Sequence, residues 1–232
     1  MKKLAIITGT SRGIGREIAS KMIEKNYLVY GYSRNNTLTH KKYTFINKDL
    51  SELDQVRKIK FPEIKNLQEA ILINNAANIG TILPLRDKLP KDIISEYNLN
   101  LITPVLLSNN FINTYSNINK KAIINISSGA STKPIHSWST YCSSKSGLDA
   151  FTNVLSEEGC QTLSIYPGVV DTKMQEKIRE SSDDKFPLLE KFLDYHTNKD
   201  LLSPEYVASK IVKIVQNLHQ ITSKIIDIRS VE

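Results

Sequence analysis

The sequence has few of the features that mark secreted, membrane-spanning or metal-binding proteins. Its 232 residues include only two cysteines, Cys142 and Cys160, too few for a disulfide framework and suited to a reducing compartment. The apolar run after Lys3 is too short for a signal peptide, and no stretch approaches the roughly 20 apolar residues of a membrane span. Cysteine and histidine form no cluster, so no metal site is expected. These absences predict a cytoplasmic protein without a membrane segment.

Charge of one sign is not concentrated in any tract. The formal net charge is +7, but the lysines stand in ones and twos, and no basic run of five or more is present. With no recognisable nucleic-acid module, a solvated basic surface is favoured over nucleic-acid binding, and an anionic cofactor needs only a few of these charges. Hydrophobic residues make up 40% and charged residues 24%, which is typical of one globular domain.

Short apolar, β-rich runs alternate with helical patterns along the whole chain. This alternation predicts an α/β fold in which a doubly wound, mostly parallel, seven-stranded sheet carries helices on both faces, a Rossmann fold. We expect strands at 4–8, 27–32, 43–46, 70–73, 123–126, 162–166 and 224–228, and helices at 14–23, 53–59, 91–115, 139–157 and 204–218. Pro104 predicts a helix boundary or kink near Thr103. The polar, irregular residues 173–203, the lid segment, are expected to cover a substrate.

A glycine turn joins the first strand to the first helix. Gly9, Gly13 and Gly15 allow close approach of a pyrophosphate, and the helix N-terminus that follows offers unpaired N–H groups and a positive dipole end. A tight strand-to-helix turn would also use glycine, but its place inside a βαβ pattern favours cofactor binding. The cofactor residues expected here are Gly9, Ser11, Arg12, Gly13, Ile14 and Gly15.

The second strand ends in Ser33 and Arg34, where an NAD-specific site carries an acid for the adenosine 2′-hydroxyl. A hydroxyl and a guanidinium suit a 2′-phosphate instead, and Arg12 could close on it from the other side, so NADP(H) is favoured over NAD(H). The fourth strand ends in a polar pair and two small residues, Asn74 to Ala77, at the sheet edge where ligands bind. From this loop we expect Asn75, Ala76 and Ala77 to wall the cofactor crevice.

The stretch 123–148 carries the chemistry. Tyr141 and Lys145 stand four residues apart and share one face of a helix, while Ser128 follows a buried strand. A hydroxyl, a phenol and an ammonium that converge suit proton delivery to a carbonyl oxygen. The same Tyr-x-x-x-Lys spacing recurs at Tyr195 and Tyr206, where an exposed helix face explains it.

The order and spacing of these motifs resemble the short-chain dehydrogenase/reductase family over nearly the whole chain. They are Thr8-Gly9-x-x-x-Gly13-Ile14-Gly15, Asn74-Asn75-Ala76-Ala77, Ser128, Tyr141-x-x-x-Lys145 and Pro167-Gly168. Ala77 departs from the glycine that is usual in the family. The sequences from Trp138 to Phe151 and after Pro167 are similar to those of the sepiapterin reductase-like branch. They are most similar to the bacterial (S)-benzil reductases, which reduce a 1,2-diketone with NADPH.

The resemblance implies roles for individual residues. Tyr141 would be the general acid, with a pKa lowered by Lys145; Lys145 would also bind the nicotinamide ribose; and Ser128 would hold the substrate oxygen. Asn100 matches the catalytic asparagine of the family, which holds a water in a proton relay. Further cofactor contacts are implied for Asp49, Leu50, Pro167, Gly168, Val170 and Thr172, and apolar substrate contacts are expected from Ile135, Trp138, Val169, Met174 and Phe186.

The resemblance also implies a homodimer or homotetramer through helices at roughly 91–117 and 139–157. Two alternatives stay open. A sepiapterin-type pterin side-chain reductase would be favoured by a pterin-binding acid near the C-terminus, where Asp227 and Glu232 are the acids present. A non-catalytic NADP(H)-binding regulator on the same fold would have no need for all four of Asn100, Ser128, Tyr141 and Lys145.

Overall fold

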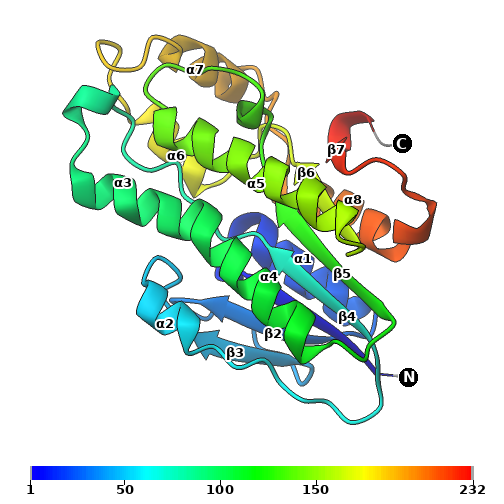
Figure 1. Ribbon diagram of the computed structural model, residues 1–232. Coiled ribbons are helices and arrows are strands. Elements are labelled where there is room, and N and C mark those ends of the chain that lie inside the picture. The colour runs from blue at the N-terminus through cyan, green and yellow to red at the C-terminus, as the bar shows by residue number, and fades with distance from the viewer. Residues whose placement is uncertain (1, 231–232) are drawn as a thin grey trace.

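Seven parallel strands form the centre of the computed structural model, which describes residues 2–230 (Figure 1). Their order across the sheet is β3-β2-β1-β4-β5-β6-β7, so the chain winds outward from β1 in both directions. This confirms the predicted doubly wound sheet, and each neighbouring pair of strands is parallel. The strands are β1 Lys2–Thr8, β2 Leu28–Ser33, β3 Tyr43–Asn47, β4 Leu67–Asn74, β5 Lys120–Ile126, β6 Thr162–Tyr166 and β7 Ile225–Asp227.

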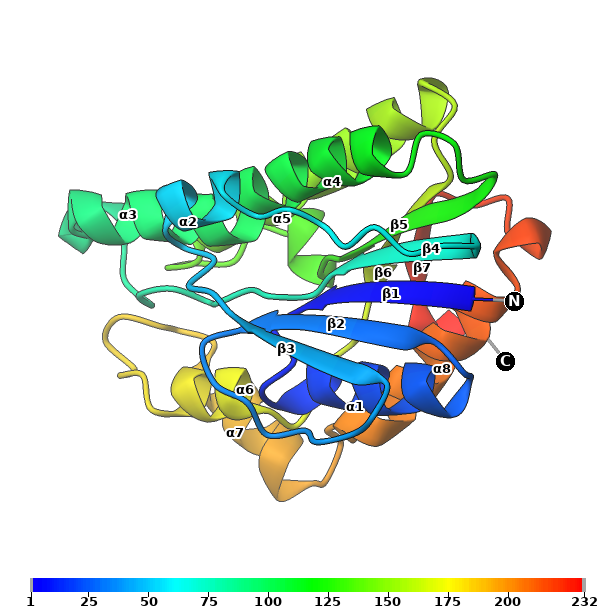
Figure 2. The same cartoon turned by 90° about the horizontal axis from the view of Figure 1, so that it is seen from below.

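Helices cover both faces of the sheet (Figure 2). One face carries α2 Leu53–Arg57, α3 Pro90–Tyr97, α4 Thr103–Thr114 and α5 Ser139–Glu157. The other carries α1 Gly13–Glu24 and α8 Pro204–Gln216, with α6 Lys173–Arg179 and α7 Leu189–Thr197 beside them. The helices predicted at 139–157 and 204–218 are therefore confirmed. No helix within residues 2–230 is long and apolar enough to cross a membrane.

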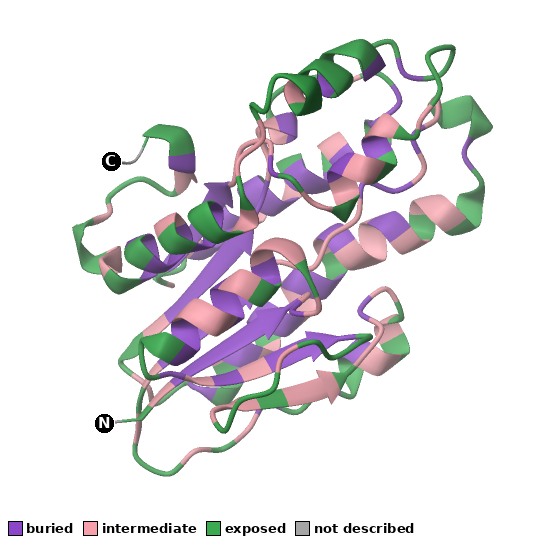
Figure 3. Cartoon of the chain, turned by 180° about the vertical axis from the view of Figure 1, so that it is seen from behind, coloured by how far each residue is buried: buried purple, intermediate pink, exposed green. Residues whose placement is uncertain are grey.

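The central strands β1, β4, β5 and β6 are rich in apolar residues and are largely buried, as the purple strands of Figure 3 show. In β1, Ala5 and Ile7 pack toward α1 and α8, whereas Leu4 and Ile6 pack toward α4. All four side chains are fully buried. Successive side chains of a strand point to opposite faces of the sheet, so these residues pack into two separate layers of core.

The predicted helix at 91–115 has a break where Pro104 requires one. It consists of α3, a π-helical turn over Asn98–Ile102, and α4, which begins at Thr103 with Pro104 in its first turn. Proline is tolerated in a first turn because that N–H has no partner within the helix. Asn100 lies in the middle of this wide turn and is buried.

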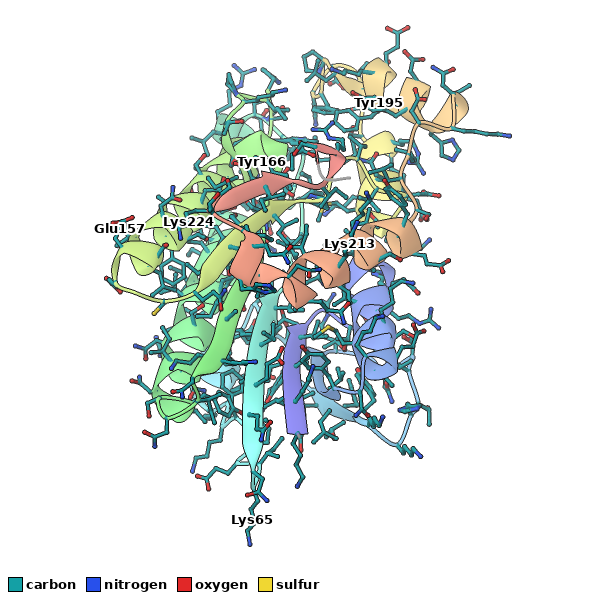
Figure 4. All side chains as sticks on the ribbon, turned by 90° about the vertical axis from the view of Figure 1, so that its right-hand side faces the viewer. Lys65, Glu157, Tyr166, Tyr195, Lys213 and Lys224 are labelled. Carbon is teal, nitrogen blue, oxygen red and sulfur yellow. The ribbon has the colours of Figure 1, made fainter. Side chains whose placement is uncertain are left out.

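The lid segment lies at the end of the molecule where the strands terminate. Figure 4 shows Tyr195 of α7 at this end and Lys65, just before β4, at the opposite end. Phe186, between α6 and α7, is completely buried and packs against the helix that carries Tyr141. The expectation that this segment covers a substrate remains a proposal.

Candidate functional site

The glycine turn after β1 is fixed by the loop that follows β4. The Asn75 side chain donates to the carbonyl oxygens of Thr8 (2.9 Å) and Gly9 (3.3 Å), and the Thr8 hydroxyl accepts the N–H groups of Asn75 and Ala76, each at 2.9 Å. Gly9 has φ +75°, and a Cβ there would lie 2.9 Å from the Asn75 amide. Both the backbone conformation and the space therefore require glycine. The two predicted loops meet as expected.

The first turn of α1 has no side-chain cap. Arg12 occupies the N-cap position but makes no side-chain cap, so the leading N–H groups of this 12-residue helix lack a side-chain acceptor. A Cβ on Gly13, whose φ is +56°, would lie 3.3 Å from the Thr172 methyl group, so Thr172 faces this turn. The positive end of the helix dipole, the N–H groups without a side-chain acceptor and a backbone that a ligand can approach closely suit the pyrophosphate of a nicotinamide dinucleotide. The predicted pyrophosphate and nicotinamide residues are thus neighbours.

At the end of β2 the structure orients the two predicted phosphate ligands differently. The Arg34 side chain is largely exposed and lies 3.9 Å from the Asp49 carboxylate. The Ser33 side chain is buried, and its hydroxyl donates to the Asn35 carbonyl oxygen (2.8 Å). The Asp49 pKa is held below its usual value, because hydrogen bonds from Ser51 and the charge of Arg34 outweigh burial. Of these two residues, Arg34 is therefore the one whose side chain is exposed.

Leu50, the other residue expected near the adenine, is buried, and its carbonyl oxygen accepts the Thr103 hydroxyl at 2.7 Å. The loop after β6 carries the remaining predicted cofactor contacts. Gly168 takes φ +75°, and Val170 bridges to Leu202, which fixes the loop against the end of the lid segment. These loops follow β3 and β6, on either side of the glycine turn.

The catalytic candidates lie where β5 ends and α5 begins. Lys145 is buried; its ammonium donates to the Ile126 carbonyl oxygen (2.8 Å) and lies 5.9 Å from the centre of the Tyr141 ring. The Ser128 hydroxyl accepts the N–H of Ala130 (3.1 Å), which fixes the turn after β5. The structure therefore brings the phenol and the ammonium together on one face of α5, as their spacing predicts.

Burial controls protonation at this pair. It raises the pKa of Tyr141 to about 12, while a hydrogen bond with Ser128 acts in the opposite direction. It lowers the pKa of Lys145 to about 8, against the upward effect of the Asp149 carboxylate. The expectation that the pKa of Tyr141 is lowered is therefore wrong for this arrangement, because desolvation of the phenolate outweighs the hydrogen bond with Ser128. At neutral pH the phenol keeps its proton and can donate it.

Asn100 is held by the loop that follows β4. Its Oδ1 accepts the N–H of Asn78 (3.0 Å), and its Nδ2 donates to the Asn78 carbonyl oxygen (2.9 Å). Both polar atoms of the side chain are thus engaged by one backbone unit. The asparagine that is unfavourable in an ordinary helix has a specific partner here.

Aromatic residues fill the space beside Tyr141. The Trp138 ring meets Tyr141 edge-on (5.7 Å between centres) and stacks on Phe186 (5.4 Å, 9° between planes). Met174 and Ile135 pack against the same cluster. Four of the five predicted substrate residues therefore gather around the phenol. Val169 lies outside this cluster, and its carbonyl oxygen accepts the N–H of Leu202 at 2.9 Å.

A chain of buried polar side chains, whose connection no sequence motif predicts, runs through the core. The Asn74 amide donates to Asn125 (2.9 Å), whose own amide donates to Thr152 (2.9 Å), so β4, β5 and α5 are joined in one chain. Asparagine inside an otherwise apolar strand is the one sequence signal that could have revealed it, because a buried amide needs a partner. Within residues 2–230, no group of three or more His, Cys, Asp or Glu side chains could hold a metal ion.

Comparison with known proteins shows the family to which the chain belongs. The sequence model of the family described as short chain dehydrogenase matches residues 3–183. The chain is 35% identical to a benzil reductase ((S)-benzoin forming) of Bacillus subtilis, over 92% of this chain and 93% of that protein. It is 28% identical to the sepiapterin reductase of Bos taurus, over 93% and 90%. A crystal structure of a short-chain dehydrogenase/reductase from Saccharomyces cerevisiae superposes with a TM-score of 0.86 at 22% identity, covering 99% of this chain and 97% of that one.

Proposed function

Because the chain belongs to the short-chain dehydrogenase/reductase family, whose members act on CH–OH or C=O groups, we propose that it is an NADPH-dependent reductase of ketones and 1,2-diketones. The observation that carries the proposal is the buried Tyr141 phenol, with a pKa of about 12, beside Lys145 and Ser128. A protonated phenol at the edge of a cofactor crevice suits proton donation to a carbonyl oxygen.

The cofactor half of the proposal rests on the donor set. The glycine turn and the first turn of α1 would hold the pyrophosphate, and Arg34 and Arg12 would hold a 2′-phosphate. The bound nicotinamide would supply the hydride. Lys145 would bind the ribose next to it, and Thr172 and Val170 would orient the carboxamide. Because Ser33 is buried and its hydroxyl donates to the Asn35 carbonyl oxygen, we take the two arginines as the principal determinants of NADPH preference.

The proton half rests on three side chains. Ser128 would hydrogen-bond the substrate oxygen, and Tyr141 would give its proton to that oxygen as negative charge develops there. Lys145, charged below a pH of about 8, would stabilise the phenolate that remains. Through its two hydrogen bonds with Asn78, Asn100 would fix the loop after β4 and so position the water of the proton relay.

A donor without a partner favours a substrate with two oxygens. The Trp138 indole N–H is buried and has no hydrogen-bond acceptor within residues 2–230, although its ring contacts Tyr141. An unsatisfied buried donor costs about 1–3 kcal/mol, which an acceptor on the substrate would recover. We infer that the second carbonyl oxygen of a 1,2-diketone accepts from it. The aromatic cluster around Trp138 suits aromatic substituents, and the printed name of the Bacillus subtilis relative agrees with this class.

The function is tested by the loss of NADPH or NADH absorbance as each cofactor is oxidised by a carbonyl compound. Four compounds are compared: benzil, the mono-ketone in which CH₂ replaces one carbonyl of benzil, sepiapterin and an acetoacetyl thioester. We expect benzil to be reduced with NADPH, and Tyr141→Phe to lose turnover while it still binds NADPH. Trp138→Phe keeps the ring but removes the donor, so kcat/KM should fall by roughly 5- to 150-fold for benzil and stay unchanged for the mono-ketone. An equal loss with both ketones would overturn the role of the indole N–H.

Cofactor preference has its own matched pair of variants. Arg34→Ala should reduce the preference for NADPH over NADH, whereas Arg57→Ala, a similarly exposed arginine that pairs with Asp54, should leave it unchanged. Preference of the wild-type protein for NADH would overturn the assignment of Arg34. Tight NADPH binding without turnover of any ketone would favour the regulator.

The sepiapterin-type alternative has one structural counterargument. It calls for an acid near the C-terminus. The Asp227 carboxylate there accepts two hydrogen bonds from the Arg229 guanidinium, one from Nε (2.9 Å) and one from Nη2, and a third from the Arg229 backbone N–H (3.0 Å). Glu232 lies outside the described residues. A pterin would have to displace the guanidinium, so we expect sepiapterin to be a poor substrate relative to benzil.

We also propose a cytoplasmic homodimer or homotetramer. Large apolar side chains are exposed along α3, the turn after it and α5, at Leu89, Ile94, Ile102 and Val154. A face of this kind favours pairing with a second copy. Light scattering of the purified protein tests this assembly, and a monomer at micromolar concentration would contradict it. Both cysteines are unpaired, as a reducing compartment requires.

A further inference from the structure

Two oppositely charged side chains are buried outside the catalytic set. Lys88 and Glu96 have side-chain exposures of 0% and 3%, and the Lys88 ammonium donates to the Glu96 carboxylate at 2.8 Å. Charged groups are almost never buried to this degree unless they are paired and fully hydrogen-bonded. The pair is not part of the proposed proton or hydride chemistry, so its place in the fold needs a reason.

The Glu96 carboxylate has a donor on every side. One oxygen accepts the N–H of Thr81 (2.7 Å) and its hydroxyl (3.2 Å), and the other accepts Lys88 and the Thr140 hydroxyl. Lys88 in turn donates to the Thr140 hydroxyl at 2.5 Å. Gly80, with φ +73°, has no room for a Cβ, which would overlap this carboxylate. Although burial alone would raise the pKa of Glu96, these donors hold it below its ordinary value, and the carboxylate stays ionised.

The location of the network relates it to two catalytic residues. Glu96 precedes Asn100 by four residues, and both side chains bind the same loop after β4: Asn100 holds Asn78, and Glu96 holds Thr81. At its other end the network reaches Thr140, the residue directly before Tyr141. One carboxylate thus connects the helix of Asn100, the loop that holds Asn100, and the first turn of the helix of Tyr141.

We propose that Glu96 and Lys88 are positioning residues that set the place of the Tyr141 phenol relative to Asn100, acting through the Thr140 hydroxyl. This inference rests on the proposed reductase function. An apolar contact would tolerate sliding of α5 along α3, whereas hydrogen bonds to a carboxylate fix both distance and direction. A buried ion pair gives little net stability compared with an apolar pair, so geometry is the better reason for its presence.

Thr140→Val is the informative variant, because it keeps the shape of the side chain and leaves Lys88 and Glu96 paired with each other. We expect kcat for benzil to fall roughly 10- to 100-fold, the loss typical of a small displacement of a reacting group, with Kd for NADPH within about twofold of wild type. Thr140→Ser should restore kcat, because the hydroxyl returns.

Thr152→Val is the matched control on the same helix. Its hydroxyl accepts from Asn125 (2.9 Å) and is fully buried, so the variant loses a comparable hydrogen bond far from the phenol. We expect its Tm to fall while kcat stays within about twofold of wild type. Equal losses of kcat in Thr140→Val and Thr152→Val, or no loss in either, would overturn the positioning role.

A second readout does not depend on turnover. Trp138 is the only tryptophan of the chain; it is buried, precedes Thr140 by two residues and contacts Tyr141. Its emission therefore reports the position of the first turn of α5. We expect a red shift in Thr140→Val and none in Thr152→Val. If wild-type protein reduced none of the carbonyls, the proposed function would fail, while an unshifted Trp138 emission in Thr140→Val would overturn the positioning role separately.

Discussion

Replacing glycine by alanine at two positions tests how tightly the cofactor turn is packed. A Cβ on Gly15 would overlap the Gly9 carbonyl oxygen and the Asn75 amide nitrogen, whereas a Cβ on Gly129 would have nothing within 4 Å. The Gly9 oxygen belongs to the main chain and cannot rotate away. The same chemical change is therefore expected to have opposite effects at the two sites.

The magnitudes follow from the surroundings. Overpacking costs about 1–3 kcal/mol, and the rigid obstacle at Gly15 favours the upper end. Alanine regains about 0.5–1 kcal/mol because Gly15 is helical, which leaves a net destabilisation of about 2 kcal/mol. For a chain of this size that lowers Tm by roughly 4–8 °C. Gly129→Ala should gain about 0.4–1 kcal/mol through the unfolded state and raise Tm by roughly 1–4 °C.

Calorimetry and NADPH titration measure both effects. Since the added methyl group at Gly15 displaces the Asn75 amide that holds the turn, we also expect weaker NADPH binding in Gly15→Ala and unchanged binding in Gly129→Ala. Equal Tm values for the two variants would refute the reasoning from packing. Tight NADPH binding by a destabilised Gly15→Ala protein would refute the assignment of this turn to the cofactor.

Two further predictions concern protonation and the lid segment. The pKa of Lys145 is lowered to about 8, so kcat/KM for NADPH should fall by up to about tenfold per pH unit above pH 8 as the ammonium loses its charge. The pKa of Tyr141 is raised to about 12, so no second decrease should begin below about pH 11. A flat profile to about pH 10 would contradict the role of the Lys145 charge. Phe186→Ala removes a ring stacked on Trp138, which destabilises the aromatic cluster locally by about 3–5 kcal/mol. Amide hydrogen exchange should therefore accelerate in residues 173–203 but not in β1. Uniform acceleration would show that the aromatic cluster supports the whole fold.

The sequence by itself determined the architecture and the reactive pair. Strand and helix periods are local properties, so the alternation of apolar runs predicted the seven parallel strands, and α5 was placed at its observed bounds. Tyr141 and Lys145 could be paired from their spacing alone, because one helix turn brings residues four apart together. Pro104 predicted the start of α4 for a similar local reason.

Only the tertiary structure decided how these groups are tuned and held. The direction of the Tyr141 pKa depends on how completely other segments exclude water from the phenol, and the burial of Ser33 depends on packing against Thr10, whose hydroxyl lies 3.4 Å from the Ser33 hydroxyl. The pairing of Lys88 and Glu96 joins a loop, α3 and α5, and neither residue belongs to a recognisable motif. Burial and long-range hydrogen bonds are set by chain segments far apart in sequence, so no local pattern carries them.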